Sequence, residues 1–284
     1  MGARIRLLAV DVDGTLICRG LLTREDSAAL HEAARAGIVV CLCTGRSWLE
    51  VKGVWDDLKL PSPHAPIICV GGALVAEPDT GRTLYSRAFD RAVADGLAQA
   101  MRRRGYPVML LVDAWREGFD YYLIGDYNDR PLYHRFYDGR PFRIRYVQRL
   151  DDGCVRPLRV SVLEEPDLAQ DLVHALREEF AGRIEIQSIF APNYGVHVVE
   201  AFAHGANKFT AMIYAGQGYG IGPGAMAAIG DDHNDLAMLR GVAFSATTAD
   251  APPELREAAG VVLSARGKNP VAAFVRMVLE HNGR

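Results

Sequence analysis

The chain has 284 residues, which is enough for one large domain or two ordinary ones. Apolar residues make up 49% of it and charged residues 24%, which excludes a disordered or fibrous protein. The net charge of −3, with both signs spread along the chain, argues against a general binder of nucleic acid or anionic membranes. No apolar segment approaches the roughly 18 residues that a membrane helix needs. The five cysteines form no CxxC pair, which argues against a zinc site. Their number is odd and three of them lie in apolar runs, so a reducing cytoplasm fits best.

The first part of the chain alternates apolar runs with amphipathic segments. The apolar runs at 7–10, 38–43 and 67–70 predict strands that are buried on both faces. Helices are predicted between them, and the first of these has a capping residue in Thr23 and an end at Gly37. This alternation predicts a parallel, doubly wound sheet, which is an α/β fold.

The pattern changes at about residue 86. A helix is predicted from Asp90 to Gly105, and a second one over 168–180. The strand-like stretches around these helices often alternate apolar with polar residues, as in a sheet with one wet face. We therefore expect an inserted α+β domain over residues 86–194.

The first pattern returns at about residue 195. A helix is predicted over 209–215 and a last one over 271–279, with apolar strands at 225–229 and 242–246 between them. One sheet is therefore expected to form from both ends of the chain, residues 1–85 and 195–284.

Polar residues follow three of the predicted buried strands. Asp11 and Asp13 end the first strand, Thr44 ends the second, and the acidic segment 230–235 ends a late one. Ligands of an open parallel sheet bind beyond these strand ends. Carboxylates gathered there repel one another unless a cation is present, and hard oxygen ligands favour Mg²⁺. Lys208 begins a helix, where its ammonium group could favour an anion.

In this order, the segments resemble the four motifs of the haloacid dehalogenase (HAD) superfamily. They read DVDGT at 11–15, TGR at 44–46, a lysine at position 208 and GDDHND at 230–235. The insertion resembles the large α+β (type IIB-like) cap of the Cof-like sugar phosphatase branch. The resemblance implies a Rossmann-like core with an inserted cap that would close over the crevice and choose the leaving group.

The resemblance also implies a role for each catalytic residue. Asp11 would attack phosphorus and form an aspartyl-phosphate. Asp13 would protonate the leaving oxygen and then activate the attacking water. Thr44 would hold the phosphoryl group, and Lys208 would neutralise charge on it and on Asp11.

Further residues are implied to bind phosphate or metal. The phosphate-binding group is Gly45, Arg46 and Asn234, and the Mg²⁺ ligands are Asp11, Asp13 through its backbone carbonyl, Asp231 and Asp235. Arg46 is equally compatible with bracing its own loop. Whether the nearby Asp232, His233 or Asp250 contacts metal or substrate stays open.

Two segments depart from the pattern of many Cof-like proteins. Gly71-Gly72 stands in place of Asn-Gly, and Ala249-Asp250-Ala251 in place of Gly-Asn-Ala. Asp250 adds negative charge near the crevice. These departures concern the identity of the substrate and leave the expected core chemistry intact.

The sequence as a whole predicts a cytoplasmic, Mg²⁺-dependent phosphomonoester phosphatase. Its expected partner is a small phosphorylated metabolite, with sugar phosphates as the first choice, and no nucleic acid or membrane partner is expected.

The alternatives are a phosphomutase of the same superfamily and a non-catalytic phospho-ligand binding protein. A two-component receiver domain is disfavoured by the large insertion. The arginines among aromatic residues over 133–149 fit a solvated sheet face better than an anion-gripping site. The sequence leaves the oligomeric state open.

Overall fold

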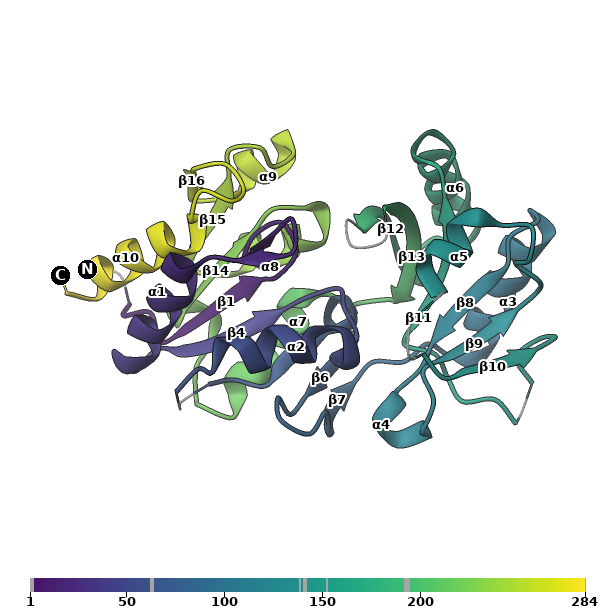
Figure 1. The fold of residues 1–284 in the computed structure, drawn as a ribbon, viewed down its shortest axis with the longest axis horizontal. Helices are drawn as coiled ribbons and strands as arrows, with labels where there is room; N and C mark the ends of the chain where they lie inside the picture. The colour runs from purple at the N-terminus through teal and green to yellow at the C-terminus, as the bar shows by residue number, and fades with distance from the viewer. Residues whose placement is uncertain are drawn as a thin grey trace. The chain divides into compact units, whose positions relative to one another are not determined.

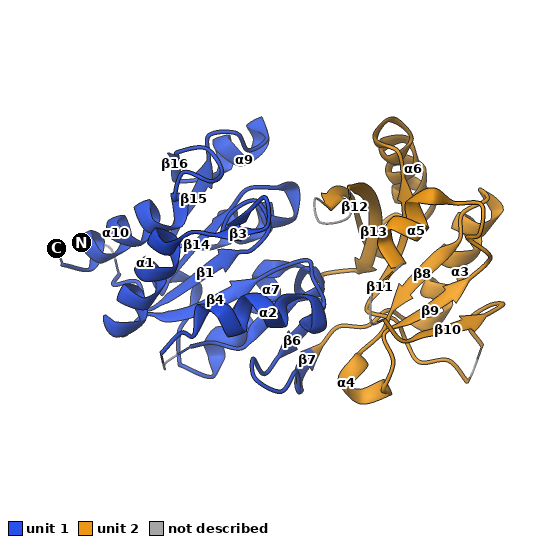
Figure 2. Cartoon of the chain, in the orientation of Figure 1, with its two compact units in different colours: residues 1–85, 207–284 blue, residues 86–206 orange. Residues whose placement is uncertain are grey.

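The computed structural model describes residues 3–61, 64–137, 139, 142–151, 153–191 and 195–283. The chain divides into two compact units, which Figure 2 shows in two colours. The first unit combines residues 1–85 with 207–284, and the second is the continuous stretch 86–206. Among the described residues, no helix is long and apolar enough to cross a membrane.

The first unit is built on an eight-stranded sheet (Figure 1). Its strands are β1 (Leu7–Asp11), β4 (Val39–Cys43), β5 (Ile67–Cys69), β6 (Leu74–Ala76), β7 (Thr83–Ser86), β14 (Met226–Gly230), β15 (Phe244–Thr248) and β16 (Val261–Leu263). They lie in the order β16-β15-β14-β1-β4-β5-β6-β7. The pairings from β16 to β5 are parallel, and β6 runs antiparallel to β5. The predicted parallel sheet is thereby confirmed.

Strand β1 joins the two ends of the chain. Leu7 pairs with Val39 of β4 on one side and with Met226 of β14 on the other. All residues of these three strands are buried, as their uninterrupted apolar sequences predict. Because the three strands are parallel, their carboxyl ends lie at one edge of the sheet.

Helices flank this sheet and complete the core of the first unit. They are α1 (Arg24–Arg35), α2 (Trp48–Leu58), α7 (Lys208–Gln217), α8 (Leu236–Gly241), α9 (Pro253–Ala258) and α10 (Pro270–Gly283). The Thr23 side chain caps α1 by accepting from the Asp26 backbone N–H at 3.1 Å, as predicted. Asp26 Oδ1 in turn accepts from the Ala272 backbone N–H at 2.8 Å, which ties α1 to α10. Short elements also occur: β2 (Ile17–Cys18) pairs with β3 (Leu21–Leu22), and three 3₁₀ turns cover Val70–Gly72, Pro223–Ala225 and His233–Asp235.

The second unit has its own six-stranded sheet. Its strands are β8 (Val108–Leu111), β9 (Tyr121–Ile124), β10 (Ile144–Val147), β11 (Arg159–Glu164), β12 (Ile184–Ala191) and β13 (Val196–Ala203). They lie in the order β10-β9-β8-β11-β13-β12 and are mostly antiparallel. The helices of this unit are α3 (Arg91–Arg103), α4 (Ala114–Glu117), α5 (Pro131–Tyr137) and α6 (Pro166–Glu179). Apolar residues of α3 and α6 form one core with the sheet.

The second boundary of the inserted unit differs from the position expected from the sequence. The sequence analysis places the return to the first unit at residue 195, whereas the second unit continues to residue 206. The reason is β13, which pairs with β11 on one side and with β12 on the other. Its sequence, VHVVEAFA, is apolar enough to resemble a strand of the first unit, but its hydrogen bonds place it inside the second sheet.

A tight loop after β5 contacts the loop after β4 at the edge where the parallel strands of the first unit end. The Val70 N–H donates to the Arg46 carbonyl at 2.8 Å, and the Gly71 N–H donates to the Thr44 carbonyl at 3.0 Å. Val70 has φ +52°, a conformation that a β-branched residue rarely adopts. Gly72 follows with φ +99°, and a Cβ there would lie 2.1 Å from the Asn207 carbonyl oxygen. Glycine at position 72 therefore lets α7 begin directly against this loop.

The Gly72→Ala substitution should destabilise the protein by roughly 3 kcal/mol or more, because it combines backbone strain with a backbone clash. Gly37→Ala is the matched control, since Gly37 has φ +83° but open space around its Cβ position. Strain alone should cost the control about 1 kcal/mol. Denaturant unfolding measures both free energies, and equal losses in the two variants would contradict the close approach at Asn207.

Candidate active site

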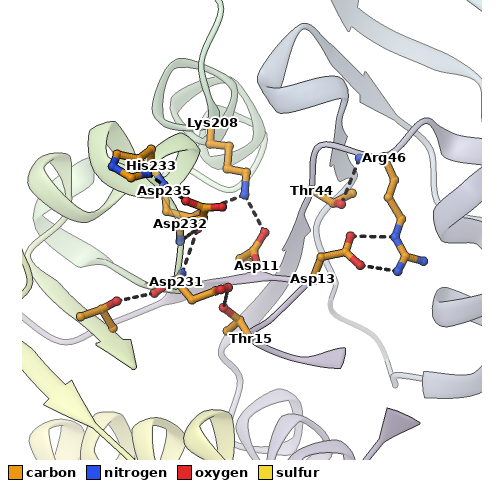
Figure 3. Close-up of polar contacts among 12 residues, drawn as sticks. Asp11, Asp13, Thr15, Thr44, Arg46, Lys208, Asp231, Asp232, His233 and Asp235 are labelled. Carbon is orange, nitrogen blue, oxygen red and sulfur yellow. Dashed lines mark hydrogen bonds and ion pairs between the residues drawn. The ribbon is translucent and has the colours of Figure 1, made fainter. Parts of the chain in front are cut away.

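Four segments distant in the sequence meet at the carboxyl edge of the first sheet (Figure 3). Asp11 ends β1, Thr44 follows β4, Lys208 begins α7, and the acidic turn 231–235 follows β14. This arrangement follows from the parallel pairing of β1 with β4 and β14.

Lys208 lies at the centre of the site. Its Nζ is 2.6 Å from Asp11 Oδ1 and 2.6 Å from Asp235 Oδ1. The Lys208 and Asp235 side chains are completely buried, and Asp11 is nearly so. Asn207 fixes the start of the helix, because its Oδ1 accepts from the Thr210 N–H at 3.0 Å. Buried charges are tolerated only when paired in this way, so the lysine and the two carboxylates require one another.

The site holds more negative charge than Lys208 can offset. Burial raises the pKa of Asp11 well above its usual range, Asp235 raises it further, and Lys208 opposes the shift. Burial also raises the pKa of Asp231 to about 6, with Asp235 adding to the effect and Arg266 opposing it. For Lys208, burial lowers the pKa, but Asp11 and Asp235 outweigh it and raise the pKa well above its usual value. A further cation at this point would therefore stabilise the ionised carboxylates.

The turn after β14 is ordered by its own carboxylates. Asp235 Oδ2 accepts from the backbone N–H groups of Asp231, at 3.0 Å, and Asp232, at 3.1 Å. The Thr15 hydroxyl donates to Asp231 Oδ1 at 2.5 Å. Arg266 Nη2 lies 2.6 Å from Asp231 Oδ2 and also donates to the Asp231 carbonyl at 3.1 Å.

The donor set fits a hard divalent cation. Asp11, Asp231 and Asp235 each offer a carboxylate oxygen, and these three oxygens lie within 4.8 Å of one another. Buried carboxylate oxygens without a thiolate or imidazole partner are the ligands that Mg²⁺ prefers. Glycine at position 14 leaves room for the Asp231 carboxylate, because a Cβ there would lie 2.2 Å from Asp231 Oδ2.

Asp13 and Arg46 form a separate pair beside this cluster. Arg46 Nε is 2.8 Å from Asp13 Oδ2 and its Nη2 is 2.5 Å from Asp13 Oδ1, a bidentate contact. The Asp13 carboxylate is therefore directed at Arg46, as Figure 3 shows, and not at the three clustered carboxylates. Arg46 also donates its backbone N–H to Thr44 Oγ1 at 3.1 Å, so it braces the loop that carries Thr44.

The remaining sequence-predicted residues lie at the rim of the site. A Cβ on Gly45 would lie 3.9 Å from Asn234 Nδ2, which brings these two residues side by side. His233 is exposed, and its Nδ1 lies 3.0 Å from Asp232 Oδ1. Asp250 Oδ1 accepts from the Arg266 backbone N–H at 3.1 Å.

Sequence reasoning missed two side chains of the site, Thr15 and Arg266. The motif containing Thr15 gave a signal, since a hydroxyl four residues after Asp11 follows the same strand end. Arg266 gave none, because it lies in an irregular segment between β16 and α10.

Comparison with known proteins is consistent with this geometry. A family model described as haloacid dehalogenase-like hydrolase matches residues 8–275. The chain is 25% identical to the 5-amino-6-(5-phospho-D-ribitylamino)uracil phosphatase YwtE of Bacillus subtilis, over 97% of this chain and 98% of that protein. It is 26% identical to a phosphoglycolate phosphatase of Methanothermobacter thermautotrophicus, over 96% of this chain and 98% of that protein.

The fold has solved counterparts as well. A haloacid dehalogenase-like hydrolase from B. subtilis superposes with a TM-score of 0.76 at 19% identity, over 96% of this chain and 99% of that one. The match to the family model covers nearly the whole sequence and includes every segment of the site. The chain therefore belongs to the haloacid dehalogenase-like hydrolase family of enzymes.

Proposed function

We propose that the protein is a Mg²⁺-dependent phosphomonoester phosphatase that works through an aspartyl-phosphate on Asp11. The observation that carries the proposal is the Lys208 ammonium group, which lies 2.6 Å from both Asp11 and Asp235 beside a third buried carboxylate. A carboxylate can approach a phosphate dianion only where positive charge screens their repulsion.

Asp11 is the proposed nucleophile. One of its oxygens bonds to phosphorus while the bond from phosphorus to the ester oxygen breaks, and the leaving oxygen takes a proton from Asp13. Asp13 then accepts a proton from water as that water attacks the aspartyl-phosphate. The products are the free alcohol, inorganic phosphate and the original carboxylate of Asp11.

Arg46 and Lys208 hold the two reacting carboxylates in place. The bidentate Arg46 contact engages both oxygens of the Asp13 carboxylate, so one oxygen must be released from Arg46 before Asp13 carries the proton for the leaving oxygen. Lys208 fixes Asp11 and places positive charge where the phosphoryl oxygens would lie. Thr44, whose side chain is buried next to this position, is the proposed partner of a phosphoryl oxygen, with Gly45 and Asn234 beside it.

The residues that would hold the metal are Asp11, Asp231 and Asp235, together with the Asp13 backbone carbonyl that the family resemblance implies. When bound, Mg²⁺ supplies charge neutralisation and orientation for the phosphoryl group. The three carboxylates face two nearby cationic side chains, Lys208 and Arg266, so a net negative charge remains for it to balance.

The proposed substrate is a small phosphorylated metabolite, with sugar phosphates as the first choice. Two relatives carry the names of phosphatases that act on small phosphorylated molecules. One is the 5-amino-6-(5-phospho-D-ribitylamino)uracil phosphatase and the other is the phosphoglycolate phosphatase. A phosphate-release screen over a panel of phosphorylated metabolites, with an aryl phosphate as the generic substrate, tests this function. Failure to release phosphate from every compound in the presence of Mg²⁺ would contradict it.

The Asp11→Asn variant should lose turnover by roughly a thousandfold or more, because the amide is a far poorer nucleophile. Phosphate release measures the loss, and circular dichroism checks the fold. Asp56→Asn is the control, since Asp56 is an exposed surface carboxylate paired with Lys52. Activity near the wild-type level in the Asp11 variant would refute the assignment of the nucleophile.

The Asp13→Asn variant should slow hydrolysis of the phosphoenzyme more than its formation when the substrate has a good leaving group. The reason is that an aryl leaving group needs little protonation, whereas the attacking water still needs a base. Acid quenching followed by mass spectrometry should then show a phosphorylated Asp11 that outlasts that of the wild type. The covalent route is weakened if neither protein shows any phosphorylated species.

Removal of divalent metal with a chelator should abolish phosphate release, and added Mg²⁺ should restore it. The expectation follows from the uncompensated charge of the three clustered carboxylates. Full turnover in rigorously metal-free buffer would exclude the proposed metal dependence while leaving the nucleophile assignment to be decided by the Asp11 variant.

A further inference from the structure

Arg266 contacts the carboxylate cluster from a turn that contains two residues with positive φ. The turn follows β16, and within it Gly267 has φ +76° and Asn269 has φ +54°. The Ser264 hydroxyl donates to the Lys268 carbonyl at 3.0 Å and closes the turn. The Arg266 backbone N–H donates to Asp250 at 3.1 Å, which ties the turn to the end of β15.

The guanidinium group of Arg266 is directed at one residue. Nη2 lies 2.6 Å from Asp231 Oδ2 and 3.1 Å from the Asp231 carbonyl oxygen. The other carboxylate oxygen of Asp231 accepts from Thr15 at 2.5 Å. Both oxygens of this proposed metal ligand are therefore already engaged by partners from the chain.

The charges of the cluster divide between two cations. Lys208 contacts Asp11 and Asp235, and Arg266 contacts Asp231. Arg266 thus supplies Asp231 with the kind of positive charge that a bound metal would supply. Without it, Asp231 would be a buried carboxylate beside Asp235 with only hydrogen bonds from neutral groups.

The two cations differ in their freedom to move. The Lys208 side chain is 0% exposed, whereas the Arg266 side chain is 34% exposed and can extend into solvent. Arg266 Nε is buried and has no hydrogen-bond partner among the described residues, so this side chain is incompletely satisfied where it lies. Of the two, Arg266 is the one that can leave its carboxylate and return to solvent.

We propose that Arg266 is a resident counter-cation that competes with the divalent metal for Asp231. The inference rests on the metal site of the proposed function. Arg266 holds the cluster together when no metal is bound, and it withdraws from Asp231 when a metal binds there. This arrangement weakens metal binding, because the Arg266 guanidinium group must first be displaced from Asp231.

Isothermal titration of the metal-free, full-length protein with Mg²⁺ tests the proposal. In Arg266→Gln the competing charge is absent, so the dissociation constant for Mg²⁺ should fall by tenfold or more. Arg266→Lys keeps the charge and should stay within about threefold of the wild type. The matched control is Arg240→Gln, because Arg240 forms an exposed pair with Glu254 in the same unit and should leave the constant unchanged.

Thermal unfolding gives a second readout that does not depend on turnover. Metal-free Arg266→Gln should unfold at a lower temperature than the wild type, and added Mg²⁺ should raise its unfolding temperature by more than it raises that of the wild type. Where Arg266→Gln does not fold without metal, Ser264→Ala takes its place, since it removes the hydroxyl that closes the turn carrying Arg266 and changes no charge. That variant should also bind Mg²⁺ more tightly, by a smaller factor.

The outcomes separate this inference from the proposed function. Unchanged or weaker Mg²⁺ binding in a folded Arg266→Gln, with the wild type binding normally, overturns the counter-cation role and leaves the metal site standing. Absence of Mg²⁺ binding in both the wild type and the variant overturns the metal site and the inference with it. A similar gain in affinity in Arg240→Gln would also overturn the proposal, because it would show an effect of overall charge alone.

Discussion

The buried ion pairs of Lys208 with Asp11 and Asp235 are the constraint on which the rest of the first unit depends. An ammonium group and two carboxylates without access to water are stable only at hydrogen-bonding distance, which here is 2.6 Å for both pairs. The start of α7 must therefore lie directly beyond the ends of β1 and β14. The glycine at position 72 and the cap at Asn207 serve this requirement, because they let the helix begin against the loop that follows β5.

One strained residue, Val70, lies at this edge of the sheet. Val70 adopts φ +52°, and its N–H and that of Gly71 hold the carbonyls of the loop that carries Thr44 and Arg46. Arg46 then orients Asp13, so the backbone after β5 determines the direction of a side chain after β1. The direction of the Asp13 side chain is thus held by the loop after a neighbouring strand and not by its own loop alone.

The parts of the site that could be predicted from the sequence are those that follow apolar strands. Asp11 and the acidic turn at 231–235 each come directly after a buried run, and parallel pairing alone brings such ends together. The contacts of Arg46 with Asp13 and of Arg266 with Asp231 could not be predicted, because they depend on side chains that cross between loops. The boundary near residue 206 was missed for a related reason, since β13 is apolar like a core strand and only its neighbours reveal its sheet.

The interleaved order of the two units has a consequence for how the chain folds as it is synthesised. The second unit is one continuous stretch, so all of its strands are available once residue 206 has emerged. Strand β1 of the first unit, by contrast, can pair with β4 early in synthesis. Its other partner, β14, is made only after the inserted unit. Pairing across so long a separation slows folding, so the inserted unit should be complete while β1 still has an open edge. Asp11, at the end of β1, consequently forms its buried ion pair with Lys208 only late in folding.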